Sequence, residues 1–127
     1  MESPGTILVV DDDPTVARLV ASALEDEGFS TSVLTDGREL LERAHEVRPE
    51  LILLDVVMPF VGLEDHLRQL NADPATRNIP ILLVTADNRA GSDIDRWREF
   101  GVVDSVLKPF DLDALSHKVN DALGEQP

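Results

Sequence analysis

The sequence of 127 residues contains no cysteine. This absence excludes disulfide bonds, thiolate metal ligands and a cysteine nucleophile, and it fits a reducing compartment such as the cytoplasm. Long apolar runs are also missing, so no segment has the length of a membrane-spanning helix. The first residues, MESPGT, have neither the basic start nor the apolar stretch of a signal peptide. We therefore expect a cytoplasmic protein that does not associate with membranes.

Basic residues are scarce. Eleven lysines and arginines stand against twenty-five aspartates and glutamates, which gives a formal net charge of −14. Such a charge repels the phosphates of nucleic acids and anionic lipids, so we expect no direct nucleic-acid binding by this chain. Most of the acidic residues are expected to favour solubility, and a minority to bind a cation.

Five short segments have the composition of β-strands. Four are aliphatic runs typical of a parallel sheet that is covered on both faces, and one alternates apolar and polar residues as an edge strand does. The aliphatic segments are residues 7–10, 51–54, 81–84 and 104–107, and the edge strand is expected at 29–34.

Between these segments the apolar residues follow the helical period. The clearest helix starts at Pro14 after a possible N-cap at Asp13 and ends near Gly28. Further helices are expected before Pro49, before the Asp73-Pro74 pair, around Ile94 and Trp97 with Ser92 as N-cap, and after Asp111. Alternating strands and helices predict a doubly wound α/β fold. We expect a single domain over residues 1–127, with a core at about 5–123.

Polar residues stand at the carboxyl ends of the predicted strands, where open α/β sheets bind their ligands. Asp11, Asp12 and Asp55 would repel one another unless a cation neutralised them, and Mg²⁺ prefers such oxygen ligands. With that ion bound, Asp55 could act as a nucleophile toward phosphorus. The Thr85 hydroxyl and the Lys108 ammonium group could then bind the phosphoryl oxygens. Each residue alone fits a cap, a turn or a surface charge, but their joint placement favours phosphoryl chemistry.

These residues resemble the receiver domain of two-component response regulators. The resemblance covers essentially the whole chain, through the motifs ILVVDDDP, LILLDVVMP, ILLVTAD and VLKPF in that order. It implies a flavodoxin-like fold with strand order 2-1-3-4-5. It also implies that Asp55 accepts a phosphoryl group from a histidine kinase or a histidine phosphotransfer protein. The implied metal is Mg²⁺, with Mn²⁺ as an alternative, bound by Asp11, Asp12, Asp55 and the backbone carbonyl of Val57.

The resemblance further implies a signalling switch rather than a classical enzyme, although the domain would catalyse its own phosphorylation and dephosphorylation. Thr85 and Lys108 would move toward the phosphoryl group. The face formed by the fourth helix, the strand at 104–107 and the last helix would then change its preference for a downstream partner or for an effector domain outside this chain. Pro109 would follow a cis peptide bond. We expect a monomer or a weak homodimer.

Three positions depart from the family pattern. Ser105 stands at the switch position, where the family commonly has an aromatic residue, and a hydroxyl can only report a shift by hydrogen bonding. Gly62-Leu63 replaces the usual Asp-Gly pair after Met-Pro. The stretch from Thr85 to Lys108 is one residue longer than the common spacing.

Two other functions are compatible with the sequence. VVDDDPTV also matches the Asp-x-Asp-x-Thr signature of haloacid dehalogenase-like phosphatases, with Asp11 as nucleophile, Asp13 as acid/base, and Thr85 and Lys108 as phosphate ligands. That interpretation leaves Asp55 unexplained. A receiver used as a scaffold without phosphorylation is the other alternative. The three histidines, His45, His66 and His117, are expected on the surface or in packing contacts.

Overall fold

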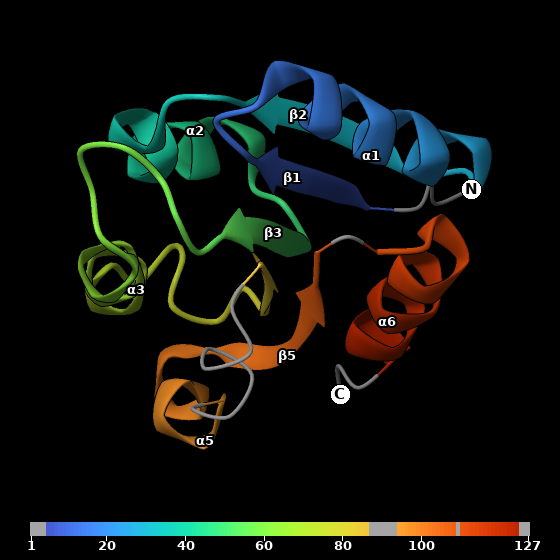
Figure 1. Ribbon diagram of the computed structural model, residues 1–127. Coiled ribbons are helices and arrows are strands. Elements are labelled where there is room, and N and C mark those ends of the chain that lie inside the picture. Colours follow the sequence, from blue (N-terminus) through green and yellow to red (C-terminus); the bar gives the residue numbers. More distant parts are fainter. Residues whose placement is uncertain (1–4, 87–93, 109, 125–127) are drawn as a thin grey trace.

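The computed structural model describes residues 5–86, 94–108 and 110–124 (Figure 1). Its sheet has five parallel strands in the order β2-β1-β3-β4-β5, which confirms the expected fold and strand order. The strands are Thr6–Val10 (β1), Ser30–Leu34 (β2), Leu51–Asp55 (β3), Ile81–Thr85 (β4) and Val102–Leu107 (β5).

Helices cover both faces of the sheet (Figure 1). The elements are α1 (Pro14–Asp26), η1 (Gly37–Glu39), α2 (Leu40–Val47), α3 (Leu63–Ala72), α5 (Ile94–Trp97), η2 (Arg98–Phe100) and α6 (Leu112–Gly124). One face packs against α1 and α6, and the other against α2, α3 and α5. None of the described helices is long and apolar enough to cross a membrane.

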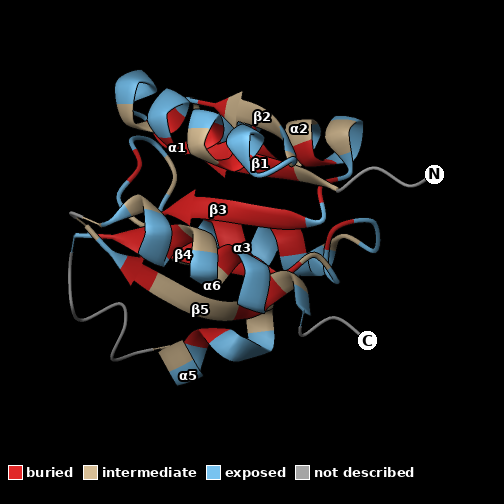
Figure 2. Cartoon of the chain, turned by 90° about the vertical axis from the view of Figure 1, so that its right-hand side faces the viewer, coloured by how far each residue is buried: buried red, intermediate tan, exposed pale blue. Residues whose placement is uncertain are grey.

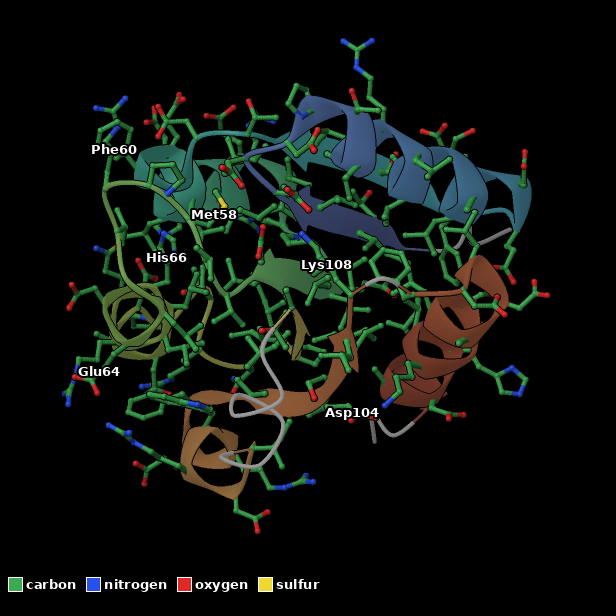
Figure 3. All side chains as sticks on the ribbon, in the orientation of Figure 1. Met58, Phe60, Glu64, His66, Asp104 and Lys108 are labelled. Carbon is green, nitrogen blue, oxygen red and sulfur yellow. The ribbon has the colours of Figure 1, made fainter. Side chains whose placement is uncertain are left out.

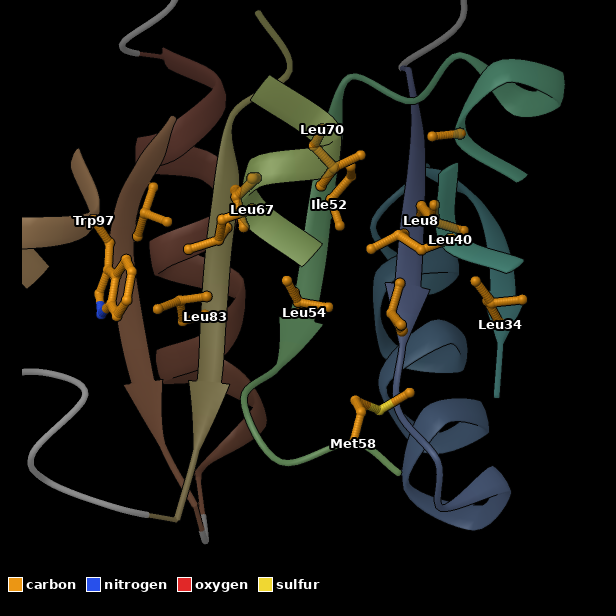
Figure 4. Packing of buried hydrophobic residues seen from close by; sticks show 14 residues of the cluster. Leu8, Leu34, Leu40, Ile52, Leu54, Met58, Leu67, Leu70, Leu83 and Trp97 are labelled. Carbon is orange, nitrogen blue, oxygen red and sulfur yellow. The ribbon is translucent and has the colours of Figure 1, made fainter. Parts of the chain in front are cut away.

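Successive side chains of β1, β3 and β4 enter opposite cores, because strand side chains alternate between the two faces. In β1, Leu8 and Val10 belong to the core under α2, α3 and α5, which Figure 4 shows from close by. Ile7 and Val9 belong to the core under α1 and α6. The strand β3 is buried along its whole length (Figure 2). The aliphatic runs in the sequence are therefore explained by two apolar faces.

The start of α1 follows the expected capping geometry. Asp13 has an extended backbone, its Oδ1 accepts the N–H of Thr15 at 2.9 Å, and Pro14 is the first helical residue. At the other end, Gly28 has φ +99°, a conformation that glycine adopts without steric cost. Both boundaries of this helix were predictable from the sequence.

The structure also differs from the expected elements in places. Asp55 and Thr85 are the last residues of their strands rather than the first residues beyond them. The strand β5 begins two residues earlier than predicted, at Val102, next to a register irregularity between Ile81 and Leu82. The turn η1 was not predicted. Ser92 as a cap and the peptide bond of Pro109 lie outside the described residues.

Trp97 is buried at 8% exposure and belongs to the core under α2, α3 and α5. Its helix α5 has only four residues, and the chain continues as the 3-10 turn η2 up to Gly101. Phe100 and Phe110 pack against the two cores as partly buried residues. The three histidines also fulfil the expectation. His45 and His117 are exposed, whereas His66 is buried and contacts the carbonyl of Gly37.

Candidate functional site

The alternation of side chains places Asp11, Asp55 and Lys108 on one side of the carboxyl edge. Asp11 continues the series that begins with Ile7 and Val9, Asp55 follows Leu51 and Leu53, and Lys108 follows Val106. All of these apolar residues face α1 and α6. Because parallel strands end at the same edge, the three charged residues meet there.

Lys108 contacts both buried acids. Its Nζ lies 3.0 Å from Oδ2 of Asp11 and 3.2 Å from Oδ2 of Asp55. Both carboxylates are nearly inaccessible, at 5% and 6% exposure. Figure 3 shows Lys108 at this edge, with Met58 and Phe60 on the loop that follows β3. Lys108 therefore supplies the positive charge that two adjacent buried carboxylates require.

The remaining oxygen atoms of the two acids are held by backbone groups. The N–H of Asp13 donates to Oδ1 of Asp11 at 2.9 Å, and the N–H of Val57 donates to Oδ1 of Asp55 at 3.2 Å. Both contacts connect a carboxylate to the turn that follows its own strand. The orientation of each acid is thus fixed by the local backbone as well as by Lys108.

Three carboxylates form a group that fits a divalent cation. One oxygen atom from each of Asp11, Asp12 and Asp55 lies within 4.8 Å of the other two. Asp12 is exposed, whereas the other two are buried. Hard oxygen donors with one solvent-facing side match the ligand preference of Mg²⁺, which usually retains several water molecules.

Burial is the main influence on the ionisation of Asp55. It raises the pKa of this carboxyl group above the usual 3.8, and the neighbouring charge of Asp11 raises it further, while Lys108 and the Val57 N–H act in the opposite direction. For Lys108, burial disfavours the charged form, but the contacts with Asp11 and Asp55 outweigh it and raise the pKa. The site holds a lysine that stays charged beside an acid whose ionisation is costly.

Thr85 and Asp13 take different positions from the charged pair. Thr85 is buried at 2% exposure at the end of β4, and its carbonyl accepts the N–H of Lys108 at 2.6 Å. It continues the series of Ile81 and Leu83, so its side chain starts from the opposite face of the sheet. Asp13, by contrast, lies outside the carboxylate group and caps α1.

Comparisons with known proteins agree with this geometry. The family model described as the response regulator receiver domain matches residues 7–120. The chain belongs to this family. It is a receiver domain of two-component response regulators, which are signalling switches rather than classical enzymes.

Curated relatives of this receiver are longer proteins. It is 39% identical over 117 residues to the DNA-binding response regulator MtrA of Mycolicibacterium smegmatis, covering 92% of this chain and 50% of the relative. It is 36% identical to the probable transcriptional regulatory protein TcrX of Mycobacterium tuberculosis, covering 88% of this chain and 47% of the relative. The receiver thus spans about half the length of the curated relatives it matches.

Solved structures show the same fold at nearly full length. A putative response regulator from Chloroflexus aurantiacus has a TM-score of 0.85 at 30% identity, with 96% of this chain and 99% of that chain covered. The receiver domain of a sensor histidine kinase from Pseudomonas aeruginosa has a TM-score of 0.83 at 25% identity, with 97% and 100% covered. That structure has a magnesium ion coordinated in its active site cleft. Receiver domains bind Mg²⁺ in an acidic pocket, and the carboxylate group of this receiver is consistent with such a pocket.

Ser105 is held by a contact that the sequence did not reveal. In the receiver, Nζ of Lys118 on α6 donates to the Ser105 carbonyl at 2.9 Å and contacts Asp104 Oδ2 at 3.2 Å. Asp104 Oδ1 also accepts the N–H of Ser105 at 2.7 Å. The position where the family commonly has an aromatic side chain is therefore attached to α6 by a lysine bridge. A lysine 13 residues away in sequence gives no local signal for this contact.

The loop after β3 contains a second feature that the sequence did not reveal. Phe60 has φ +73°, a left-handed backbone that costs a residue with a side chain about 1–2 kcal/mol. Phe60 is 77% exposed, and the Arg38 guanidinium lies 4.1 Å from the centroid of its ring. Such a cation–π contact contributes only about 0.5–1 kcal/mol at an exposed site. Arg38 is itself paired with Asp36 at 2.8 Å.

Behind this loop, η1 and α3 are joined by a buried histidine. His66 Nε2 donates to the Gly37 carbonyl at 3.1 Å. A Cβ at position 37 would lie 2.9 Å from the His66 ring, so the close contact requires glycine. Burial lowers the pKa of His66 below 6.5, more strongly than the Gly37 contact raises it. The neutral imidazole is therefore the stable form in the folded receiver.

The altered turn into α3 keeps its helix without a side-chain cap. Gly62 occupies the N-cap position with an extended backbone, and a Cβ there would meet nothing within 4 Å. Position 62 therefore offers no capping side chain, and α3 begins without one.

Proposed function

We propose that Asp55 is the phosphoacceptor of this receiver and that its donor is a phosphohistidine of a histidine kinase or a histidine phosphotransfer protein. The observation that supports this most directly is the position of Lys108, whose Nζ lies 3.2 Å from Asp55 and 3.0 Å from Asp11. A buried carboxylate at a strand end is costly for folding, because burial disfavours its charged form. Beside a lysine and a second acid, it is suited to nucleophilic attack on phosphorus.

In the transfer step, a carboxylate oxygen of Asp55 attacks the phosphorus atom. A P–O bond forms, the P–N bond to the donor imidazole breaks, and its electron pair returns to the imidazole nitrogen. The Lys108 ammonium group, already within reach of Asp55, donates to a phosphoryl oxygen. The Thr85 hydroxyl is assigned as a second donor to these oxygens.

Asp11, Asp12 and Asp55 are assigned as ligands of Mg²⁺, or of Mn²⁺, together with the backbone carbonyl of Val57. When bound, this cation neutralises the carboxylates and polarises a phosphoryl oxygen. The oxygen donors of the three acids fit it, since one from each lies within 4.8 Å of the others. The N–H contacts to Asp11 and Asp55 keep both carboxylates directed toward the edge.

The new phosphoryl charge would act on the face formed by α5, β5 and α6, through Thr85 and Lys108 at the ends of β4 and β5. Ser105 is assigned as the switch position on this face. The output then passes to a downstream protein or to an effector domain outside this chain. We also propose that residues 1–127 form one domain with a core at about 5–123, in the cytoplasm, as a monomer or a weak homodimer, and that it catalyses its own phosphorylation and dephosphorylation.

The expectation of no direct nucleic-acid binding concerns these residues with their net charge of −14. It does not extend to longer proteins, because the relatives named as DNA-binding response regulators have about twice the matched length. Direct DNA contact in such a protein would come from its other half.

The phosphatase alternative receives no support from the site. It needs Asp13 as an acid/base beside Asp11, whereas Asp13 Oδ1 accepts the N–H groups of Thr15 and Val16 at the start of α1. The family match also favours the receiver over both alternatives.

Acetyl phosphate with Mg²⁺ tests the proposed function, because this small donor needs no partner protein. We expect the intact mass to rise by one phosphoryl group in the wild-type chain, with the label mapped to Asp55 after reductive trapping. Asp55→Ala should remain unlabelled, and Asp13→Asn, which removes a neighbouring charge but keeps a capping side chain, should label normally. Label on Asp11, or phosphate turnover that survives Asp55→Ala, would support the phosphatase. No label and no turnover would support the scaffold.

A further inference from the structure

The exposed large hydrophobic side chains of the receiver lie around the candidate site. In the part of the chain that the structure describes, they are Leu19, Val57, Phe60 and Leu107. Leu107 immediately precedes Lys108, and Leu19 lines an apolar pocket of about 390 Å³ together with Lys108 and Phe110. Val57 and Phe60 lie on the loop that begins directly after Asp55. Exposed apolar side chains therefore lie both on the loop after β3 and next to Lys108.

Phe60 is the least expected of these residues. A glycine would adopt its left-handed backbone without steric cost, whereas a bulky side chain there is strained. The side chain gains little in return, because the residue is 77% exposed and its described ring contact is the cation of Arg38. The free receiver gains less from this ring than the backbone conformation costs. Strained residues of this kind tend to occur at functional sites.

Any protein that phosphorylates Asp55 must approach this loop. Asp55 is only 6% exposed, so a donor histidine has to reach down from a surface that rests on the surrounding edge. Phe60 is five residues beyond Asp55, on a loop that stands out from that edge (Figure 3). Exposed acids follow two other strands of the sheet, at Asp12 after β1 and at Glu39 after β2. A donor with basic residues around its histidine and an apolar contact would complement this surface.

We propose that Phe60 is a docking residue for the phosphohistidine-bearing protein that phosphorylates Asp55. The proposal rests on the proposed function. The ring supplies a rigid apolar contact that is desolvated only in the complex, and the Arg38 guanidinium lies over one of its faces. Phe60 does not touch the reacting atoms, so its effect appears in donor recognition.

The test compares two phosphodonors on the same variants. A panel of autophosphorylated histidine kinases is screened with the wild-type receiver, and the kinase with the fastest transfer is used as the protein donor, with acetyl phosphate as the small donor. Phe60→Gly removes the ring and permits the same backbone, Phe60→Tyr retains an aromatic ring, and Gln69→Ala on the exposed surface of α3 is the control.

We expect Phe60→Gly to lower kcat/KM with the kinase about tenfold or more, mainly through a higher KM, as for the loss of an aromatic hot spot. Labelling by acetyl phosphate should change by less than about twofold, since the small donor makes no docking contact. Phe60→Tyr should restore transfer from the kinase, and Gln69→Ala should match the wild type. The melting temperature of Phe60→Gly should equal or exceed that of the wild type, which separates docking from misfolding.

Four results would overturn the proposal. The donor protein would be excluded as the partner of Phe60 if the kinase phosphorylated wild type and Phe60→Gly at equal rates. The same conclusion would follow if no kinase transferred a phosphoryl group to the wild type. Equal losses with both donors would assign Phe60 to positioning the loop. A homodimer that dissociates in Phe60→Gly, measured by sedimentation velocity, would assign the ring to a second copy of this chain. Absence of acetyl phosphate labelling at Asp55 in the wild type would instead contradict the proposed function itself.

Discussion

Lys108 Nζ lies 3.2 Å from Asp55 Oδ2, at the carboxyl edge of a sheet whose two faces are both apolar. The same ammonium group lies 3.0 Å from Asp11, so one lysine serves two buried acids. This shared contact only partly offsets the burial of Asp55 and the repulsion by Asp11, because the pKa of Asp55 stays raised. The free receiver therefore contains a carboxylate that lowers its stability.

Asp55→Asn should stabilise the receiver when divalent cations are removed. Above its raised pKa, Asp55 is ionised in the fold at a cost that the unfolded chain does not have, so the neutral amide should raise the free energy of unfolding at pH 7. The gain should shrink as the pH falls through the folded pKa toward 3.8, where the wild-type carboxyl becomes protonated in both states. Urea unfolding in EDTA across this pH range measures the difference.

The control for this prediction is Asp26→Asn, which removes one exposed acid at the end of α1. It should change the free energy of unfolding by less than about 0.5 kcal/mol. A lower stability of Asp55→Asn than of the wild type would show that the contact with Lys108 outweighs burial and repulsion.

Mg²⁺ should raise the melting temperature of the wild-type receiver, and the rise should depend on Asp12. A ligand that binds only the folded state at a hundred times its Kd stabilises it by about 2.7 kcal/mol. Asp12→Asn removes a ligand and a charge, so it should lose most of this response. Asp13→Asn removes a charge one residue further along and should keep it, because Asp13 caps α1 outside the carboxylate group. Differential scanning calorimetry with a Mg²⁺ titration measures both, and equal responses would exclude the assigned ligand set.

Asp13→Ala should cost about 1 kcal/mol of stability, whereas Asp13→Asn should be nearly neutral. The reason is that Asp13 Oδ1 accepts the N–H of Thr15 at 2.9 Å, a bond that asparagine retains and alanine lacks. Chemical denaturation of the two variants provides the measurement. If both variants lost the same stability, the charge of Asp13 rather than its hydrogen bond would be the stabilising feature.

Stability should also fall as the pH drops below 6.5, through His66. Burial lowers the pKa of this histidine in the fold, so between the folded pKa and 6.5 the unfolded chain binds a proton that the folded chain does not. The free energy of unfolding therefore rises with pH through this window, and above pH 6.5 this increase is complete. His66→Gln keeps a donor for the Gly37 carbonyl and cannot titrate, so the slope should decrease in this variant.

The matched control is His117→Gln, since His117 is exposed on α6. In this variant, the free energy of unfolding should change with pH as in the wild type between the folded pKa of His66 and pH 6.5. A slope that is unchanged in His66→Gln and lost in His117→Gln would locate the titrating group on α6 instead.

The parts of the fold that follow from local chemistry could be predicted. The aliphatic runs located four strands, and the Asp13-Pro14 pair located the start of α1. The acids and Lys108 at strand ends indicated the site before any coordinates, because a parallel sheet brings its carboxyl ends together. The strand order itself came from the resemblance to receivers and not from periodicity.

The remaining features depend on contacts between distant segments. The early start of β5 goes with a register irregularity against β4, and Lys118 reaches Ser105 from another element. The left-handed backbone of Phe60 was equally hidden, because a phenylalanine gives no signal for positive φ, whereas glycine would have done. Tertiary packing decides these details, and residue type alone does not encode them.

Because both faces of the sheet are apolar, the register of β3 depends on the charged residues at its carboxyl end. In a sheet with one solvent-exposed face, a register shift of one residue is unfavourable along the whole strand, because it turns the apolar side chains toward water. In this receiver, a register shift of one residue would only exchange Leu51 and Ile52 between two hydrophobic cores. The apolar side chains of β3 therefore penalise such a shift only weakly. The same register shift would bury Asp55 in a hydrophobic core or move it away from Lys108, and either change would cost much free energy. The acid proposed to receive the phosphoryl group therefore also fixes the register of β3 in the sheet.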